Sequence, residues 1–244
     1  MKKRIAIFSV LMLVLTAGIN IYGAETPKAL NTIENKIERK IDPNKPMVAL
    51  TFDDGPSAKY TEIILDALKK HNSSATFFVV GSAAEKNKDI LVRMVKEGHE
   101  IGNHTHDHAR LTKLTDKELN FQLLETQRII TNATGYTPVI MRPPYGALND
   151  ELTKKIPMPA IIWSLDTLDW KHRNTEVICN NILKDIKNGD IVLMHDLYET
   201  TAKAAEIVVP ELIKRGYQLV TVSELYEYKK VELLAGRVYR NMYR

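Results

Sequence analysis

Two adjacent carboxylates ahead of a turn are the residues of this sequence that first suggest chemistry. Asp53 and Asp54 follow the apolar stretch Val48–Leu50, and Gly55 and Pro56 turn the chain directly after them. Both carboxylates therefore lie where a strand ends and a loop begins. Like charges this close repel each other, so we expect a cation or an arginine side chain to neutralise them.

A cluster of histidines downstream offers ligands for such a cation. His104, His106 and His108 alternate with other polar residues. One carboxylate with two histidines is a common ligand set of hydrolytic metal centres that keep positions open for water. The i, i+4 spacing predicts that His104 and His108 point the same way on one helical turn, with His106 pointing elsewhere. A surface histidine cluster that binds no metal is the alternative.

These residues belong to a series of five short motifs, and the series resembles the polysaccharide deacetylases (carbohydrate esterase family four). That family includes N-deacetylases of peptidoglycan, chitin and nodulation-factor oligosaccharides, and some acetylxylan esterases. The motifs are Thr51–Gly55, His104–His108, Arg142–Tyr145, Asp166–Trp170 and Leu193–His195. Each motif alone is weak, but all five occur in the family's order across residues 46–228, so the match is specific.

Strand-like and helical patterns alternate along the same part of the chain. The predicted strands are Met47–Phe52, Ala75–Val80, Glu100–Asn103, Val139–Arg142, Ala160–Leu165, Asp190–His195 and Gln218–Thr221. The predicted helices are Tyr60–Lys70, Ala83–Lys96, Thr115–Asn132, Thr175–Lys187 and Lys203–Arg215. This alternation predicts an α/β fold with a parallel sheet. Because the motifs follow five different strand ends, a closed or nearly closed barrel is favoured over an open doubly wound sheet. The resemblance implies an irregular (β/α) barrel with about seven parallel strands and an active site at their C-terminal ends.

The resemblance also assigns the residues of the metal centre. It implies that Asp54, His104 and His108 bind a divalent ion, Zn²⁺ or another transition metal such as Co²⁺. The first carboxylate, Asp53, is then the general base that takes a proton from the attacking water. The residues themselves leave the order of the two acids open, and Asp53 would also suit a cap of the following turn.

The last two motifs are expected to supply a proton donor and a pocket. His195 is implied as the general acid for the departing amine, and Asp169 as the carboxylate that keeps its imidazole protonated. A structural histidine at a strand end is the alternative for His195. The resemblance places Trp170 in a pocket wall. Leu193 lies two residues before His195 on one strand, so both side chains should face the site.

The third motif carries an arginine and a tyrosine. The planar fork of Arg142 suits a carboxylate, and we expect it to orient Asp53. The resemblance implies that the backbone N–H of Tyr145 helps to bind the oxyanion. Asp166 has no assigned role, and Asp107 is expected to orient one of the histidines.

The first 24 residues have the pattern of a secretory signal. Lys2, Lys3 and Arg4 precede an apolar run from Ile5 to Ala17, and small or turn-prone residues continue to Ala24. We expect this segment to be cleaved, with membrane attachment through an uncleaved N-terminus as the alternative. Both predict a protein that is secreted to the cell wall or held at the outer face of the cytoplasmic membrane.

Two further segments flank the predicted catalytic domain of residues 46–228. Residues 25–45 are expected to form a linker or arm, in which Ile33, Ile37 and Ile41 line one side of an amphipathic helix. Residues 229–244 are expected to form a solvated basic tail. Attraction of this tail to anionic wall polymers is the alternative.

Composition excludes several classes of protein. The 244 residues are 44% hydrophobic and 26% charged, which suits one large globular domain. Three of the four net positive charges lie in the first four residues, which leaves +1 for the rest, so nucleic-acid binding is not indicated. Cys179 is the only cysteine, which excludes an intramolecular disulfide, and its helical context predicts a buried structural thiol. No protein partner is implied.

The sequence therefore predicts a secreted, metal-dependent N-deacetylase of a polymer that contains GlcNAc or MurNAc, with peptidoglycan as the leading substrate. An O-acetyl esterase on xylan or another glycan is the alternative, because the same centre cleaves esters. A glycosidase is disfavoured, since its two carboxyls must flank the scissile bond ~5–9.5 Å apart. A non-catalytic wall-binding protein would be expected to lack a ligand, base or acid, and all are present here.

Overall fold

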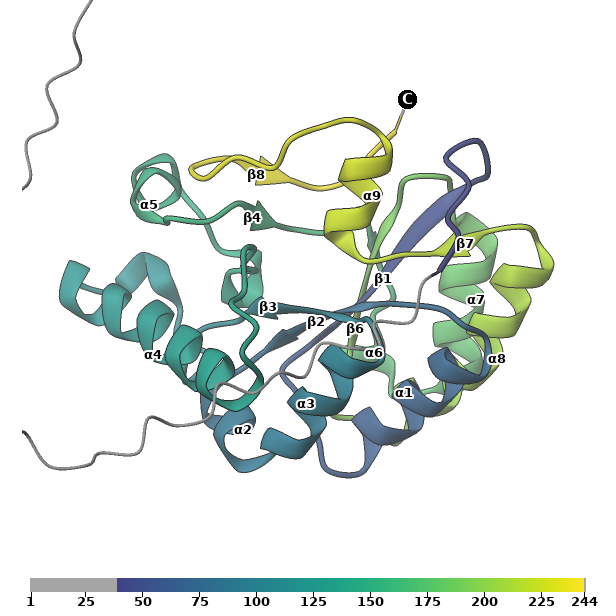
Figure 1. Ribbon diagram of the computed structural model, residues 1–244, viewed down its shortest axis with the longest axis horizontal. Coiled ribbons are helices and arrows are strands. Elements are labelled where there is room, and N and C mark those ends of the chain that lie inside the picture. The colour runs from purple at the N-terminus through teal and green to yellow at the C-terminus, as the bar shows by residue number, and fades with distance from the viewer. Residues whose placement is uncertain (1–38, 244) are drawn as a thin grey trace, which may run out of the picture. The chain divides into compact units, whose positions relative to one another are not determined.

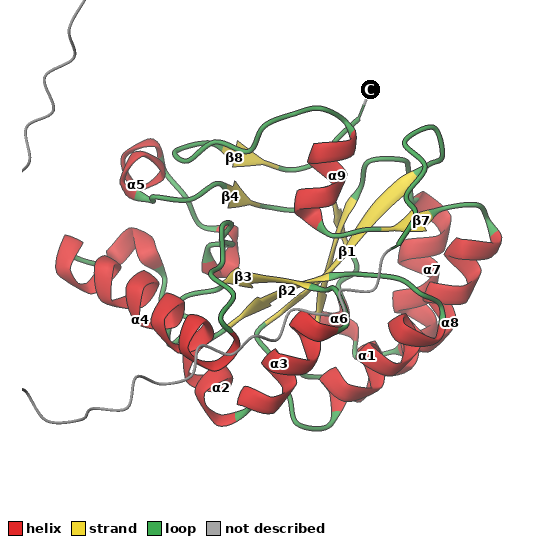
Figure 2. Ribbon diagram, in the orientation of Figure 1, coloured by secondary structure: helices red, strands yellow, loops and turns green. Residues whose placement is uncertain are grey.

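Parallel strands surrounded by helices make up residues 39–243, the part of the chain that the computed structural model describes (Figures 1 and 2). The strands are β1 (Met47–Asp53), β2 (Thr76–Val79), β3 (Glu100–Asn103), β4 (Ala160–Ile161), β5 (Leu165–Asp166), β6 (Ile191–His195), β7 (Gln218–Leu219) and β8 (Val238–Tyr239). The α-helices are α1 (Tyr60–Lys70), α2 (Gly81–Lys86), α3 (Lys88–Lys96), α4 (Asp116–Thr134), α5 (Asp150–Lys155), α6 (Asp169–His172), α7 (Thr175–Asp185), α8 (Glu199–Lys214) and α9 (Val222–Tyr228). Two 3₁₀ turns, Leu111–Lys113 and Pro144–Gly146, complete the set.

The sheet is built around β1. The strand order is β3-β2-β1-β6-β5, and β7 pairs with the first two residues of β1. The longest ladder joins β1 to β6 in parallel, in a register that places Asp53 beside His195. The predicted general base and general acid are therefore neighbours across one pair of strands.

The parallel strands of residues 39–243 are arranged as an irregular barrel that regular strand pairing does not close. Isolated bridges link Asn103 at the end of β3 to Met141, and Met141 to Ala160 in β4. A few residues later, β5 pairs with β6. The stretch from Ala160 to Asp166 thus connects both sides of the sheet, although regular pairing breaks between β4 and β5. This breaks up the strand predicted over Ala160–Leu165.

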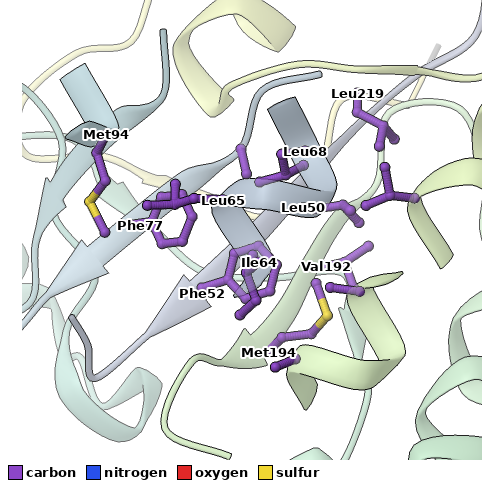
Figure 3. Close-up of a cluster of buried hydrophobic side chains, with 14 of the residues drawn as sticks. Leu50, Phe52, Ile64, Leu65, Leu68, Phe77, Met94, Val192, Met194 and Leu219 are labelled. Carbon is purple, nitrogen blue, oxygen red and sulfur yellow. The ribbon is translucent and has the colours of Figure 1, made fainter. Parts of the chain in front are cut away.

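The two faces of the central strands carry different residues because side chains alternate along a strand. On one face, Leu50 and Phe52 of β1 join the main apolar cluster, which α1 covers with its own buried residues. Figure 3 shows the labelled members of this cluster: Leu50, Phe52, Ile64, Leu65, Leu68, Phe77, Met94, Val192, Met194 and Leu219. The opposite face, which includes Thr51 and Asp53, is therefore turned away from α1 and toward the barrel interior.

Two predicted elements differ from the structure for local reasons. The strand predicted over Val139–Arg142 is reduced to two isolated bridges at Met141. Prolines flank this stretch, and proline cannot donate to a strand ladder. The helix predicted over Ala83–Lys96 divides into α2 and α3 at Asn87, whose φ of −130° is not helical. The Asn87 side-chain amide donates to the carbonyl oxygens of Pro56 and Ala83, which holds this break beside the first motif.

The C-terminal segment differs most from expectation. Residues 229–243 do not extend into solvent as a tail, because β8 pairs in parallel with β4. Leu233, Tyr239 and Met242 pack against a second apolar cluster around β1 and α9. The backbone N–H of Met242 also donates to the carbonyl oxygen of Gly189. The segment therefore belongs to the folded domain.

The N-terminal predictions fall largely outside the described residues. The signal segment, Ile33 and Ile37 lie outside residues 39–243. Ile41 is described, is not helical and packs against the second apolar cluster. Arg39 binds the Glu224 carboxylate at 2.6 Å and donates to the Leu219 carbonyl oxygen. Between residues 39 and 243, no helix has the length and apolar character needed to cross a membrane.

Candidate active site

Three candidate metal ligands converge beyond the ends of β1 and β3. The Nε2 atoms of His104 and His108 lie 3.3 and 3.2 Å from Oδ1 of Asp54, and the three atoms are all within 4.8 Å of one another. Ligands bound to a tetrahedral ion at about 2.1 Å are separated by about 3.4 Å, so this spacing fits a zinc-like ion. Oδ1 of Asp54 is buried and accepts no hydrogen bond within residues 39–243. The donor set therefore fits a divalent transition metal.

The protonation states of these groups also suit a cation. Burial raises the pKa of Asp54, but His104 and His108 outweigh this effect and hold the pKa below its usual value. Burial and the neighbouring His104 lower the pKa of His108. A deprotonated carboxylate and a neutral imidazole are the forms that bind a metal.

The histidine loop, residues 104–108, corrects the prediction of a helical turn. Thr105 and His108 have φ values of 67° and 61°, so the loop is not helical. The rings of His104 and His108 nevertheless lie 5.0 Å apart between centroids, while His106 turns away to contact Phe121. The two ligands converge because the loop is held in this irregular shape, not because of helical spacing.

Several groups from distant parts of the chain hold the histidine loop. Oε1 of Gln122 in α4 accepts hydrogen bonds from the backbone N–H groups of His106 and Asp107, at 2.9 and 3.1 Å. The first two N–H groups of α2 donate to the carbonyl oxygens of Thr105 and His106, both at 2.8 Å. Gln122 is a site residue that the sequence analysis missed, because an isolated glutamine in a helix carries no signal of its partner.

A backbone carbonyl performs the task that we expected of Asp107. The Nδ1 atom of His104 lies 2.7 Å from the carbonyl oxygen of Arg142, so Nδ1–H donates and Nε2 is left to bind a metal. The side chain of Asp107 is exposed. The expected second contact to a histidine is thus made, but by a different residue.

Asp53 is held by an arginine that crosses the barrel interior. Nη1 of Arg142 donates to Oδ1 of Asp53 at 2.6 Å and to Oγ1 of Thr51 at 2.7 Å. The arginine is wholly buried, and Asp53 is 3% exposed. The predicted pair is present, and it leaves Oδ2 of Asp53 directed toward His104 at 3.8 Å. One carboxylate oxygen is therefore anchored, and the other faces the metal ligands.

His195 at the end of β6 is paired with Asp169. Nδ1 of His195 lies 2.8 Å from Oδ1 of Asp169, whose carboxylate is wholly buried. Burial of the imidazole lowers its pKa, but the hydrogen bond and charge of Asp169 outweigh this and raise the pKa of His195 to about 9. Asp169 also accepts from Thr201 Oγ1 at 2.7 Å, a contact that the sequence analysis did not foresee. The imidazole is therefore held in its protonated form near neutral pH.

A further buried carboxyl group, that of Asp196, lies close to the site and was not foreseen in the sequence analysis. Asp196 is 1% exposed and sits so close to Gly55 that a Cβ built on Gly55 would lie 2.1 Å from its Oδ2. Oγ1 of Thr61 donates to Oδ2 at 2.5 Å and accepts from the backbone N–H of Ser57 at 2.7 Å. Burial raises the pKa of Asp196 to about 7. Only glycine at position 55 leaves room for the Asp196 carboxyl group.

Of the remaining predicted residues, Tyr145 and Trp170 are exposed at the rim, whereas Leu193 is buried. Tyr145 is 61% exposed, its ring packs 4.7 Å from that of His108, and its φ is 62°. Trp170 is 48% exposed, and its indole Nε1 lies 3.4 Å from Oδ2 of Asp166. Oδ1 of Asp166 also accepts from the backbone N–H of Leu168 at 2.9 Å, so Asp166 braces the loop that carries Trp170. Leu193 is 3% exposed and is paired with Thr51 on the interior face.

The comparisons with known proteins agree on one family. The family model described as polysaccharide deacetylase matches residues 40–158. The chain is 47% identical over 193 residues to the peptidoglycan-N-acetylmuramic acid deacetylase PdaC of Bacillus subtilis, which covers 79% of this chain and 41% of PdaC. It is 39% identical over 195 residues to a peptidoglycan-N-acetylglucosamine deacetylase of Bacillus cereus, which covers 76% of this chain and 91% of that relative. The chain thus spans about two fifths of the length of PdaC.

A solved structure is similar as well. The family 4 acetyl xylan esterase from Clostridium thermocellum, in complex with a cobalt ion, matches with a TM-score of 0.76 and 32% identity. The match covers 80% of this chain and 98% of that one.

Our first prediction concerns Gln122. Gln122→Leu removes the acceptor that holds two backbone N–H groups of the histidine loop, so the affinity for Zn²⁺ should fall about 10–100-fold, as for other groups that orient ligands. Gln122→Glu keeps an acceptor at this position and should bind within about threefold of the wild type. Competition with a chromophoric chelator measures both affinities. Equal affinities in the leucine variant and the wild type would show that the loop does not depend on Gln122.

The second prediction concerns the His195–Asp169 pair. Because its pKa of about 9 exceeds the ordinary value near 6.5, the pair stabilises the fold fully below about pH 6.5 and loses this effect as pH rises through 9. Asp169→Asn should lower the pKa of His195 by more than one unit, which NMR titration of the ring C–H signals in the metal-free protein will detect. The difference in unfolding free energy from the wild type, on the order of 3 kcal/mol at pH 6, should shrink toward pH 10. An unchanged His195 titration would contradict the role given to Asp169.

Proposed function

From the premise that this chain belongs to the polysaccharide deacetylase family, we propose that it hydrolyses the acetamido groups of a GlcNAc- or MurNAc-containing polymer. Peptidoglycan is the leading substrate, because the relatives from Bacillus subtilis and Bacillus cereus are named as peptidoglycan deacetylases. One observation carries the proposal. A metal-ligand triad, an arginine-held carboxylate and a carboxylate-held imidazole meet at the ends of paired strands, with Asp53 opposite His195.

The chemistry divides between the two sides of this site. Asp54, His104 and His108 would hold Zn²⁺ or Co²⁺, which when bound lowers the pKa of coordinated water and polarises the acetyl carbonyl. Asp53 would accept the proton of the attacking water. Arg142 keeps that carboxylate turned the same way throughout, since it binds one oxygen and leaves the other free. A positioned base of this kind contributes about 10²–10⁴ in rate.

His195 would complete the reaction as the general acid. Attack by water on the acetyl carbon makes the C–N bond the one that must break, and the sugar amine is a poor leaving group until it gains a proton. The protonated imidazole donates that proton from Nε2, because Nδ1 is bound to Asp169. Acetate and the free amine are the products. The raised pKa of His195 ensures that the proton is present at neutral pH.

The oxyanion and the acetyl methyl group would be bound by residues from three motifs. No acceptor within residues 39–243 takes the backbone N–H of Tyr145, which leaves this group available to the developing oxyanion. A donor of this type is worth roughly 2.7–4 kcal/mol. Leu193 and Trp170 would line a slot for the methyl group, since Leu193 shares the interior face with His195.

An O-acetyl esterase is the second candidate, and a specific observation favours it. The solved acetyl xylan esterase from Clostridium thermocellum matches most of this chain. The same triad, base and acid would cleave an ester, whose leaving alcohol depends less on protonation than an amine does. We further propose that the enzyme acts outside the cytoplasm on the cell wall, as its relatives' names suggest.

The third prediction tests the function and the order of the two acids. The protein loaded with Zn²⁺ or Co²⁺ should release acetate from peptidoglycan, and chelation should abolish the release. Asp53→Asn should keep metal affinity within a few-fold but lose about 10²–10⁴ in turnover, because only the base is removed. Asp54→Asn should weaken metal binding itself. Acetate assays on peptidoglycan, chitooligosaccharide and acetylxylan, with metal content from mass spectrometry, decide the matter.

Two results would contradict this proposal. Full acetate release by a verified metal-free preparation would reject the metal-dependent mechanism. Equal metal loss in both aspartate variants would show that base and ligand are assigned to the wrong carboxylates.

The fourth prediction concerns the acyl slot. Leu193→Ala should enlarge it and relax the preference for acetyl over propionyl substrates, while metal content stays unchanged. One methylene is worth about 1–3 kcal/mol of discrimination, so the wild type should disfavour propionyl by roughly 10–200-fold. The measurement is the ratio of kcat/KM for the two substrates in each protein. If the ratio does not move, Leu193 does not contact the acyl group.

A further inference from the structure

Two arginines stand at the rim of the site in matching arrangements. On the metal side, the ring of Tyr145 packs on His108, and the guanidinium of Arg110 lies 4.8 Å from the Tyr145 ring centroid. On the acid side, the ring of Tyr198 lies 6.2 Å from that of His195. The guanidinium of Arg173 lies over the Tyr198 ring. His108 and His195 each have a tyrosine ring beside them, and an arginine guanidinium lies against each of these two rings.

Both arginines are free to bind an anion. Arg110 and Arg173 are exposed, and neither takes part in an ion pair within the described part of the chain. Stacking on an aromatic ring fixes the plane of a guanidinium while leaving its N–H edge outward, which lowers the entropy lost when a carboxylate binds. Arg173 is fixed further, because its Nε donates to the carbonyl oxygen of Trp170 at 3.0 Å.

The charges inside the site bear on what the two arginines can bind. The interior groups Asp53, Asp54 and Asp169 are acidic, and Arg142, His195 and the divalent ion that the triad would hold offset them. The interior charges are thus matched within the site, and Arg110 and Arg173 remain at its entrance as cations with which a carboxylate on a bound glycan can pair. Arg110 and Arg173 lie two ring contacts from the reacting groups on opposite sides, where neighbouring units of a bound strand would run.

We propose that Arg110 and Arg173 are specificity-determining residues that recognise carboxylates on a glycan strand bound across the site. The inference rests on the proposed deacetylase function and deepens it, because it selects an anionic polymer over neutral chitooligosaccharide or xylan. In such a polymer the carboxylate belongs either to the lactyl ether of the sugar or to an attached peptide. Both sources present the same planar group to a guanidinium.

The experiment compares three acetylated substrates of different charge. They are neutral chitooligosaccharide, wall glycan stripped of its peptides, which keeps lactyl carboxylates, and wall glycan with intact peptides. Arg110→Gln with Arg173→Gln removes both charges, and the double lysine variant retains them. Lys96→Gln is the matched control, because this exposed lysine ends α3 at the opposite end of the barrel from the site.

Each exposed ion pair is worth about 1.5–5-fold, so the double glutamine variant should lose about 2–25-fold in kcat/KM on the anionic glycans, mostly through KM. Its kcat/KM on chitooligosaccharide should stay unchanged, and the loss on anionic glycan should shrink at high ionic strength. The lysine variant should retain most of the wild-type preference, and Lys96→Gln all of it. Loss on both anionic substrates assigns the contact to the lactyl carboxylate, and loss only with intact peptides assigns it to the peptide.

Two outcomes would overturn the inference. An equal fall on neutral and anionic substrates would mean that the arginines only brace the tyrosines and histidines, and no fall on any substrate would mean that they contact no part of it. Failure of the proposed function is a separate result, in which the wild type releases no acetate from any substrate. In that event, co-sedimentation with insoluble wall glycan and with chitin still decides. The double glutamine variant must then lose salt-sensitive retention on wall glycan alone, and equal retention by variant and wild type would reject the proposal.

Discussion

A buried ion pair between Arg142 and Asp53 is the interaction on which the rest of the site depends. Arg142 is the largest of the fully buried side chains in residues 39–243. Its positive charge must therefore be compensated within the barrel. Asp53 and Thr51 bind one end of the guanidinium, the carbonyl oxygens of Ile161 and Ile162 bind the rest, and its plane packs on the Phe78 ring. Removal of one partner from a buried pair typically costs about 3–5 kcal/mol. The pair therefore ties β1 to the segment that joins both sides of the sheet, and the carbonyl of the same arginine orients His104.

The ligands and the base are placed by residues that never approach the substrate. Gln122 in α4 holds the histidine loop, Thr201 in α8 holds Asp169, and Thr61 in α1 holds Asp196 beneath Gly55. These helices cover the outside of the barrel, yet each sends one polar group to a loop at the strand ends. A helix that stabilises the fold through its apolar face thus also restrains the geometry of the site.

Backbone strain is concentrated at the same loops. The described part of the chain contains eight non-glycine residues with positive φ, and five of them lie in the chemical motifs: Asp54, Thr105, His108, Tyr145 and Leu168. A residue in this region costs on the order of 1–3 kcal/mol and persists only where its surroundings fix it. The hydrogen bonds to Gln122 and to α2 supply that fixation in the histidine loop, and the bond to Asp166 supplies it at Leu168. These backbone conformations orient the side chains in directions that regular secondary structure at the same positions would not allow.

Local patterns in the sequence determined the order of elements, the parallel α/β barrel and the identity of the site motifs. The helix Tyr60–Lys70 and the strand Glu100–Asn103 coincide with prediction, because apolar periodicity and breakers act over a few residues. The Arg142–Asp53 pair was expected because a planar guanidinium suits a carboxylate, and the His195–Asp169 pair was expected from the resemblance to the family. Only the tertiary structure decided the irregular histidine loop, the support from Gln122 and Asp196, and the pairing of residues 229–243 with β4. These features depend on contacts between residues far apart along the chain, and such contacts are set by how the barrel brings its segments together rather than by any pattern within one segment.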